Sequence, residues 1–232
     1  MKIRGKVMGI LLAGCLLLAS GCTQEVKNSF TAVDYVDSVI QSIYQGEHKE
    51  YEEIVGIDED EAEEGYRDKL YSEAVYFGER FGFVQNEKTL YRTMAFYRRL
   101  YSQCKYEVLS SEKTDTGCIV TMEVSPVNLF VTHADELENR VLTFSKLVSE
   151  GLYEGETQTE IECRYCNYLL DYLEAQLDQV SWDESREITI ELAEKDGAYL
   201  VGEEELQTID QSLVLYSEEK SPTVSKAEPE AS

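Results

Sequence analysis

Apolar residues recur at helical spacing through much of the first 100 residues. Between positions 30 and 46, apolar side chains return every three or four residues and polar ones occupy the opposite face; the apolar members are Val33, Val36, Ile40, Ile43 and Tyr44. This pattern predicts an amphipathic helix, and Gly46 is well placed to end it. The same reasoning predicts helices at 49–55, from an N-cap at Asp58 to about residue 81, and at 88–104.

Alternation of apolar and polar residues predicts a β-hairpin after residue 104. Tyr106 and Val108 alternate with polar residues on the first strand. Residues 114–117 (Thr-Asp-Thr-Gly) supply a turn. The return strand has apolar side chains on one face: Cys118, Val120, Met122 and Val124. Pro126 ends this strand, because proline cannot donate to a sheet ladder.

The second half repeats the order of helices followed by a hairpin. Helices are predicted at 134–152 and 160–180, strands at 187–192 and 198–201, and a last helix at 203–215, with Trp182 packed at the junction of helix and strand. We therefore expect a helix-rich α+β domain over 30–215, in loosely similar halves of about 30–130 and 131–215. It would have two hairpin sheets or one shared sheet. By analogy, each half could be cystatin-like or nuclear-transport-factor-like.

The first 22 residues have the pattern of a secretory signal. Lys2, Arg4 and Lys6 precede an apolar run from 7 to 19, which is too short to span a hydrocarbon core of about 30 Å as a stable helix. Ala19-Ser20-Gly21-Cys22 then resembles the lipobox of bacterial lipoproteins. This resemblance implies cleavage before Cys22, a diacylglycerol on its thiol and usually a further acyl chain such as palmitate. Residues 1–21 would be the signal peptide and 22–29 the lipidated cysteine and its tether.

Two alternatives to lipidation at Cys22 follow from the same segment. A rival pattern, Leu12-Ala13-Gly14-Cys15, would leave too short an apolar region before it. An ordinary secreted protein would instead carry a free Cys22.

Charge narrows the classes of partner. The chain has 46 Asp and Glu against 21 Lys and Arg, a formal net charge of −25, which becomes −28 when residues 1–21 are removed. So negative a protein is a poor binder of nucleic acid or of an anionic membrane through basic contacts. With 43% hydrophobic residues the chain is too apolar to be disordered throughout. Residues 216–232, which carry almost no large apolar side chain, are predicted to be a disordered acidic tail.

The chain resembles uncharacterised lipoproteins of Gram-positive bacteria that carry an extracytoplasmic domain of unknown function. The segments that carry the likeness are Tyr35-Val36-Asp37, Tyr44-Gln45-Gly46, Glu61-Ala62-Glu63-Glu64, Lys105-Tyr106-Glu107-Val108, Val120-Thr121-Met122-Glu123-Val124 and Gly197-Ala198-Tyr199. The resemblance implies a mixed α+β domain held at the outer face of the cell membrane. It implies no activity.

Cys163 and Cys166 form the sharpest local pattern, Cys-Arg-Tyr-Cys. A thioredoxin-like redox site would need this pair at a helix N-terminus, and residues 157–161 alternate enough to be the preceding strand. Against this, such a site uses a nearby cis-proline, and no proline occurs between Pro126 and Pro222. The spacing of Cys163, Cys166, Leu170, Leu173 and Leu177 instead predicts two thiols on the buried face of a helix.

The other cysteines and the acidic residues give no clear metal site. Cys104 and Cys118 are spaced unlike a zinc motif, and hairpin symmetry would put Cys118 near Ser110, so we expect mostly reduced thiols and no metal or cofactor. Residues 47–69 hold 11 acids and 3 bases but do not match the EF-hand spacing. We interpret this block as a solvated helix start, with weak calcium binding as the alternative.

A basic island at 88–105 contains no acid. Arg92 and Arg99 within it could contact an anion, or they could pair with the acid-rich helix that comes earlier in the chain.

No catalytic constellation is evident. His48 and His133 lie outside serine or cysteine nucleophile motifs, and there is no glycine-rich phosphate loop. We expect a non-enzymatic, lipid-anchored binding or envelope-associated protein. The alternative is an extracytoplasmic thiol-redox or other enzyme that uses Cys163 and Cys166.

Overall fold

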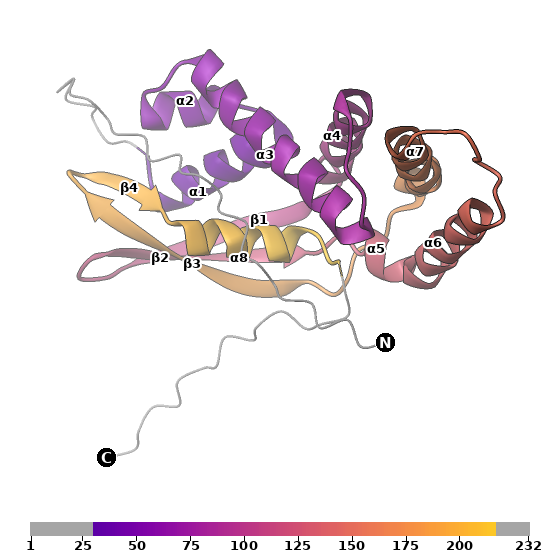
Figure 1. The fold of residues 1–232 in the computed structure, drawn as a ribbon. Helices are drawn as coiled ribbons and strands as arrows, with labels where there is room; N and C mark the ends of the chain where they lie inside the picture. Colours follow the sequence, from indigo (N-terminus) through magenta and orange to yellow (C-terminus); the bar gives the residue numbers. More distant parts are fainter. Residues whose placement is uncertain (1–29, 217–232) are drawn as a thin grey trace.

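Four antiparallel strands form one sheet at the base of the molecule (Figure 1). The computed structural model describes residues 30–216, and the order across the sheet is β1 (Lys105–Lys113), β2 (Gly117–Ser125), β3 (Arg186–Lys195) and β4 (Ala198–Val201). Because β2 pairs with β3, the two predicted hairpins join into a single shared sheet.

The first helices match the predicted pattern closely. α1 (Ala32–Ile40) begins at Thr31, whose side chain forms a capping box with Asp34, and continues as a π-helical turn η1 (Gln41–Gln45) that ends at Gly46. The bounds of the next three helices are α2 (Lys49–Val55), α3 (Glu59–Phe81) and α4 (Glu87–Tyr101). Asp58 caps α3 as predicted, since its side chain accepts from the Glu61 N–H.

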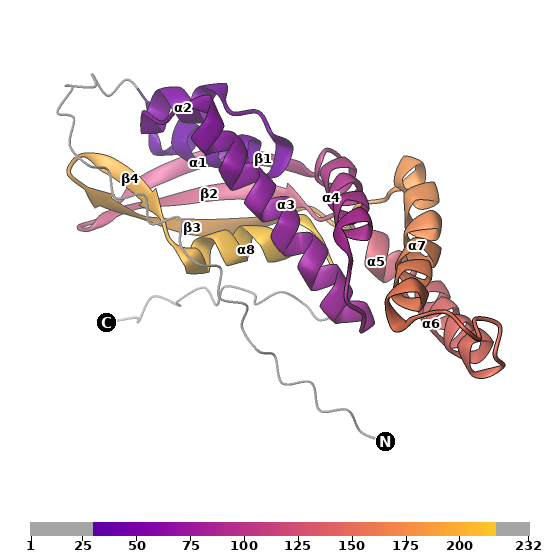
Figure 2. The same ribbon diagram turned by 45° about the horizontal axis from the view of Figure 1, so that its top comes forward.

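The second half of the chain adds a helical hairpin and a closing helix. A short helix α5 (Leu129–Thr132), too brief to show a period in the sequence, precedes α6 (Ala134–Ser149) and α7 (Gln158–Gln176), which ends in the 3-10 turn η2 (Leu177–Gln179); α8 (Glu203–Leu213) follows β4. The helices α6 and α7 stand to one side of the sheet, with α7 beside α4 (Figures 1 and 2).

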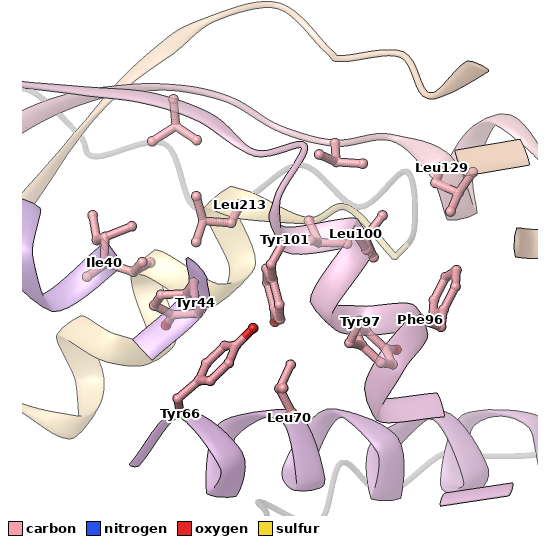
Figure 3. Close-up of a cluster of buried hydrophobic side chains, with 14 of the residues drawn as sticks. Ile40, Tyr44, Tyr66, Leu70, Phe96, Tyr97, Leu100, Tyr101, Leu129 and Leu213 are labelled. Atoms are coloured by element: carbon pink, nitrogen blue, oxygen red, sulfur yellow. The ribbon is translucent and has the colours of Figure 1, made fainter. Parts of the chain in front are cut away.

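The core lies between one face of the sheet and the helices. The alternating residues of β2 point into it as predicted, and Val120, Met122 and Val124 are fully buried. Aromatic side chains from η1, α3 and α4 fill the space between the sheet and α3 (Figure 3). Tyr44 and Tyr101, for example, meet edge to face with ring centroids 5.2 Å apart.

Trp182 lies at the predicted junction of helix and strand. Its Nε1 donates to the Gln103 carbonyl at 2.8 Å, and the Lys105 ammonium sits 3.2 Å from the centre of its ring. These contacts join the segment before β3 to the segment before β1.

Two local expectations are wrong. Residues 157–161 are not a strand, because Thr157 caps α7 and forms a capping box with Glu160. Cys118 lies opposite Lys113, not near Ser110, because only the four residues 114–117 separate the paired positions.

No helix among residues 30–216 is both long and apolar enough to cross a membrane. Cys15, Cys22 and the predicted signal, tether and tail lie outside the described residues, apart from Tyr216. That residue stacks on Phe130 with ring centroids 4.7 Å apart.

Candidate functional site

The contact between α4 and α7 brings together residues that the sequence presented as separate patterns. Arg92 lies on α4, and Cys163 and Cys166 lie on the facing helix α7. Arg99, two turns further along α4, reaches Asp178 in η2 at 3.6 Å, where both side chains are largely exposed.

Arg92 is held by α7 through a set of charge-assisted hydrogen bonds. Its guanidinium donates to both carboxylate oxygens of Glu174 at 3.0 and 2.8 Å, to Asp171 at 2.6 Å and to the side-chain oxygen of Asn167 at 2.7 Å. The hydrogen bonds that Arg92 donates to Glu174, and then to Asp171, raise its pKa above its usual range. The acids that pair with Arg92 are thus on α7 and not on the acid-rich α3, and any added anion would compete with two carboxylates.

The two cysteines of α7 have different surroundings. Cys166 is fully buried, and burial raises the pKa of its thiol to about 11. Cys163 is partly exposed and its sulfur accepts from the Asn86 side-chain amide at 2.8 Å. Both are free thiols, as are Cys104 and Cys118. The helix dipole favours a thiolate most in the first turn of a helix. Cys163 lies beyond that turn, because α7 starts at Gln158.

A hollow of about 320 Å³ opens between α6 and α7. It is lined by Phe144, Leu147, Tyr153, Arg164, Asn167, Tyr168 and Asp171. Phe144 stacks on Tyr153 and on Tyr165, with ring centroids 5.4 and 4.9 Å apart. Arg164 pairs with Glu156 at 2.6 Å. The hollow therefore combines ring faces with a guanidinium, an amide and a carboxylate.

Sequence reasoning did not find this hollow. Its lining comes from two helices and from the connection between them, which meet only in the folded chain. The high tyrosine content was the only signal, and it does not say which tyrosines line a hollow.

A second hollow of similar volume lies beside η1 and α2, and His48 lines it. His48 Nδ1 is 2.9 Å from Ser42 Oγ and Nε2 is 3.1 Å from Glu63 Oε2, which are the partners of a serine hydrolase triad. However, Ser42 is only 1% exposed and does not line the hollow, so a substrate cannot reach its oxygen. These contacts instead tie η1 to the start of α2 and to α3.

A buried ionic network links α3 to α8. The Lys69 ammonium lies 2.7 Å from Glu73 and 2.6 Å from Asp210, and the Tyr44 hydroxyl donates to Asp210 at 2.5 Å. Tyr216 donates to the other oxygen of Glu73 at 2.8 Å. Lys69 belongs to the acidic block 47–69, which we interpreted as a solvated helix start. For Lys69 that interpretation is wrong, because its side chain is buried. Neither hollow reaches the network, and its role is to hold helices together.

Within residues 30–216, no group of three or more His, Cys, Asp or Glu side chains is arranged to hold a metal ion. The acidic residues of α2 and the start of α3 are mostly exposed on their helices.

Comparison with known proteins gives one likeness, at the level of fold. No protein-family model matches the chain, and no curated protein matches it. The fold is similar to that of a solved structure described as a "putative lipoprotein (ycdA)" from Bacillus subtilis, with a TM-score of 0.57 and 11% sequence identity. The match covers 78% of this chain and 55% of that one, so this chain corresponds to little more than half of that protein. The chain therefore shares its fold with a protein of a Gram-positive bacterium that is described as a "putative lipoprotein", the class of protein that its sequence resembles.

Proposed function

We propose that this protein is a lipid-anchored binding protein on the outer face of the cell membrane. The observation that carries the proposal is Cys22, which follows Ala19-Ser20-Gly21 at the end of a short apolar segment. The fold similarity to a protein described as a lipoprotein supports it independently. Two or three acyl chains, at about 0.8 kcal/mol per buried methylene, make a durable anchor. The net charge of −28 without residues 1–21 supports such an anchor, because an anionic membrane repels the protein.

Replacement of Cys22 tests the anchor, and the rival pattern supplies a matched control. Cys22→Ala should move the full-length protein from the membrane fraction to the soluble fraction and remove the acyl mass from its N-terminal peptide. Cys15→Ala should leave the protein on the membrane. Retention of Cys22→Ala on the membrane, or release of Cys15→Ala alone, would refute an anchor at Cys22.

We place the ligand in the hollow between α6 and α7. Ring faces together with a guanidinium, an amide and a carboxylate suit a small polar molecule that has one flat apolar side, such as a sugar or a short peptide. Nothing around this hollow supplies an accessible nucleophile beside a base, and we therefore propose binding without catalysis.

Two tyrosine substitutions, one in the lining of the hollow and one at an exposed position elsewhere, test whether the ligand binds there. A panel of oligosaccharides and short peptides, screened by saturation-transfer NMR, should give binding to the wild-type protein. Tyr153→Ser should abolish that binding, whereas Tyr91→Ser, on the exposed side of α4, should preserve it. Binding that survives Tyr153→Ser, or a panel without any binder, would contradict a ligand site at this hollow.

A second candidate is a thiol-redox function at Cys163 and Cys166. The partial exposure of Cys163, one helical turn from a second thiol, favours it. The raised pKa of Cys166 disfavours it, because a thiolate is the reactive species. Titration of the folded protein with a thiol reagent decides between a redox function and ligand binding alone. Fast reaction of Cys163 near neutral pH would support redox chemistry, and slow reaction would favour a binding protein.

A further inference from the structure

The outward face of the sheet carries two rows of glutamates. In the register of the strands, Glu107 lies opposite Glu123, and Glu123 lies opposite Glu187, so three carboxylates cross β1, β2 and β3 in line. In the second row, Glu112 and Glu191 flank Ile119. All five glutamates are exposed. We call Glu107, Glu112, Glu123, Glu187 and Glu191 the acidic sheet face.

The helices leave this face open. The residues of β2 and β3 that alternate with these glutamates, such as Met122 and Ile190, are fully buried beneath the helices. Figure 1 shows α1 to α4 on one side of the sheet. The glutamates point to the other side, where Thr121 and Thr189 lie opposite each other between the two rows.

The first row works against the stability of the sheet. Like charges directly opposite one another on neighbouring strands are destabilising, and Glu123 has such a neighbour on both sides. None of the five glutamates forms an ion pair with any residue between 30 and 216. By contrast, the α7 carboxylates Asp171 and Glu174 are neutralised by Arg92.

We propose that the acidic sheet face is a docking surface for a basic protein, whose lysine and arginine side chains insert between the glutamates. Charge complementarity selects this occupant. A second copy of the chain brings the same large negative charge, and an anionic membrane repels the face in the same way. A cation between Glu107 and Glu123, or between Glu123 and Glu187, would turn each repulsive pair into two attractive contacts.

Within its two rows the face offers little apolar surface to a partner. Its only large apolar member within the two rows is Ile119, which is half-buried between Glu112 and Glu191. Affinity would therefore come from charge and hydrogen bonds. It should fall steeply as salt rises, because salt screens exposed charges.

A decalysine peptide labelled with a fluorophore serves as the probe for the full mature protein. The sheet-face variant is Glu107→Gln/Glu123→Gln/Glu187→Gln. The control variant is Glu79→Gln/Glu138→Gln/Glu204→Gln, which removes the same charge from exposed positions on three separate helices. At low salt, the sheet-face variant should bind the probe about tenfold more weakly than wild type, and the control should change by less than about twofold.

Several outcomes would overturn the proposal. Equal weakening in the two variants would mean that only total charge attracts the probe. An unchanged affinity in the sheet-face variant would mean that the face takes no part. Self-association of the wild type that the sheet-face variant abolishes, seen by analytical ultracentrifugation, would assign the face to a second copy, and loss of binding to anionic vesicles would assign it to lipid. Thermal unfolding shows that the variants fold; if the triple variant does not, Glu123→Gln alone carries the test, with Glu138→Gln as its control.

Discussion

Lys69 is a charged side chain in the interior. It is 7% exposed, lies between the carboxylates of Glu73 and Asp210, and faces the ring of Tyr44 at 5.2 Å. Burial alone would lower the pKa of Lys69, but the two carboxylates outweigh burial and raise it above its usual value. Burial raises the pKa of Asp210, although Lys69 opposes that rise. Lys69 and Asp210 thus stabilise each other's charged form, which burial alone would disfavour.

Removal of the Lys69 charge should be strongly destabilising. Lys69→Met leaves two buried carboxylates without a cation, and we expect the free energy of unfolding in urea to fall by about 3–5 kcal/mol. Arg67→Met on the same helix is the control, because its pair with Glu64 is long, at 3.8 Å, and both side chains are exposed. A loss for Lys69→Met no larger than that for Arg67→Met would show that the network contributes little.

Buried thiols should make the fold sensitive to alkali. Burial raises the pKa of Cys104 to about 12 and that of Cys166 to about 11, whereas the pKa of a thiol in the unfolded chain is about 8.5. Between these values the unfolded state loses protons that the folded state keeps, so stability that is present below about pH 8.5 is lost as pH rises. Urea unfolding between pH 7 and 10.5 should show this decline. In Cys166→Ala the free energy of unfolding should decline less steeply with pH than in the wild type, by up to about 1.4 kcal/mol per pH unit. An identical slope in the two proteins would contradict this prediction.

At the scale of elements, the end of the first helix shows how a local signal can hide a long-range contact. Gly46 ends η1 with a φ of 73°, as its place after the apolar pattern predicted. The structure adds that a Cβ at this position would lie 2.7 Å from Cε1 of Tyr66 on α3. Glycine is therefore required at Gly46 twice, once for the backbone and once for the packing of α3.

Alanine at two glycines can separate these requirements. Gly46→Ala and Gly56→Ala both place a side chain at a positive φ, which costs about 1–2 kcal/mol. Gly56 has nothing within 4 Å, whereas Gly46 meets Tyr66, so Gly46→Ala should cost about 1–3 kcal/mol more. Chemical unfolding of both variants measures the difference. Equal losses would show that the Tyr66 ring moves aside freely.

The α4–α7 contact is another feature of the elements that no single segment predicts. The sequence identified the basic island of α4, but it placed the acidic partners of Arg92 on the earlier helix. In the structure those partners are Asn167, Asp171 and Glu174, on successive turns of one face of α7. Because α6 packs beside α7, this contact also sets the position of the hollow.

On the scale of the whole molecule, excess negative charge opposes folding. The chain carries −25, and many of its acids, including the acidic sheet face, are exposed. Added salt screens exposed charges beyond about 10 Å at 0.1 M, and should therefore relieve this repulsion.

We expect the melting temperature to rise as sodium chloride increases from about 0.05 to 0.5 M at neutral pH. Thermal unfolding followed by circular dichroism measures this directly. Glu107→Gln/Glu123→Gln/Glu187→Gln should have a higher melting temperature at low salt and a smaller response to salt. A melting temperature that falls with salt would show that attractive surface pairs, such as Arg99 with Asp178, outweigh the repulsion.

The sequence by itself determined most of the helices and strands, where Gly46 and Asp58 bound them, and that the fold is helix-rich α+β; it missed α5 and suggested a strand at 157–161. Those properties depend on periodicity and capping, which act over a few neighbouring residues. Only the tertiary structure decided that β2 pairs with β3 to make one sheet, that Lys69 is buried between Glu73 and Asp210, and that Glu107, Glu123 and Glu187 stand in line. Each of these depends on residues far apart in the chain, whose meeting is set by how the elements pack.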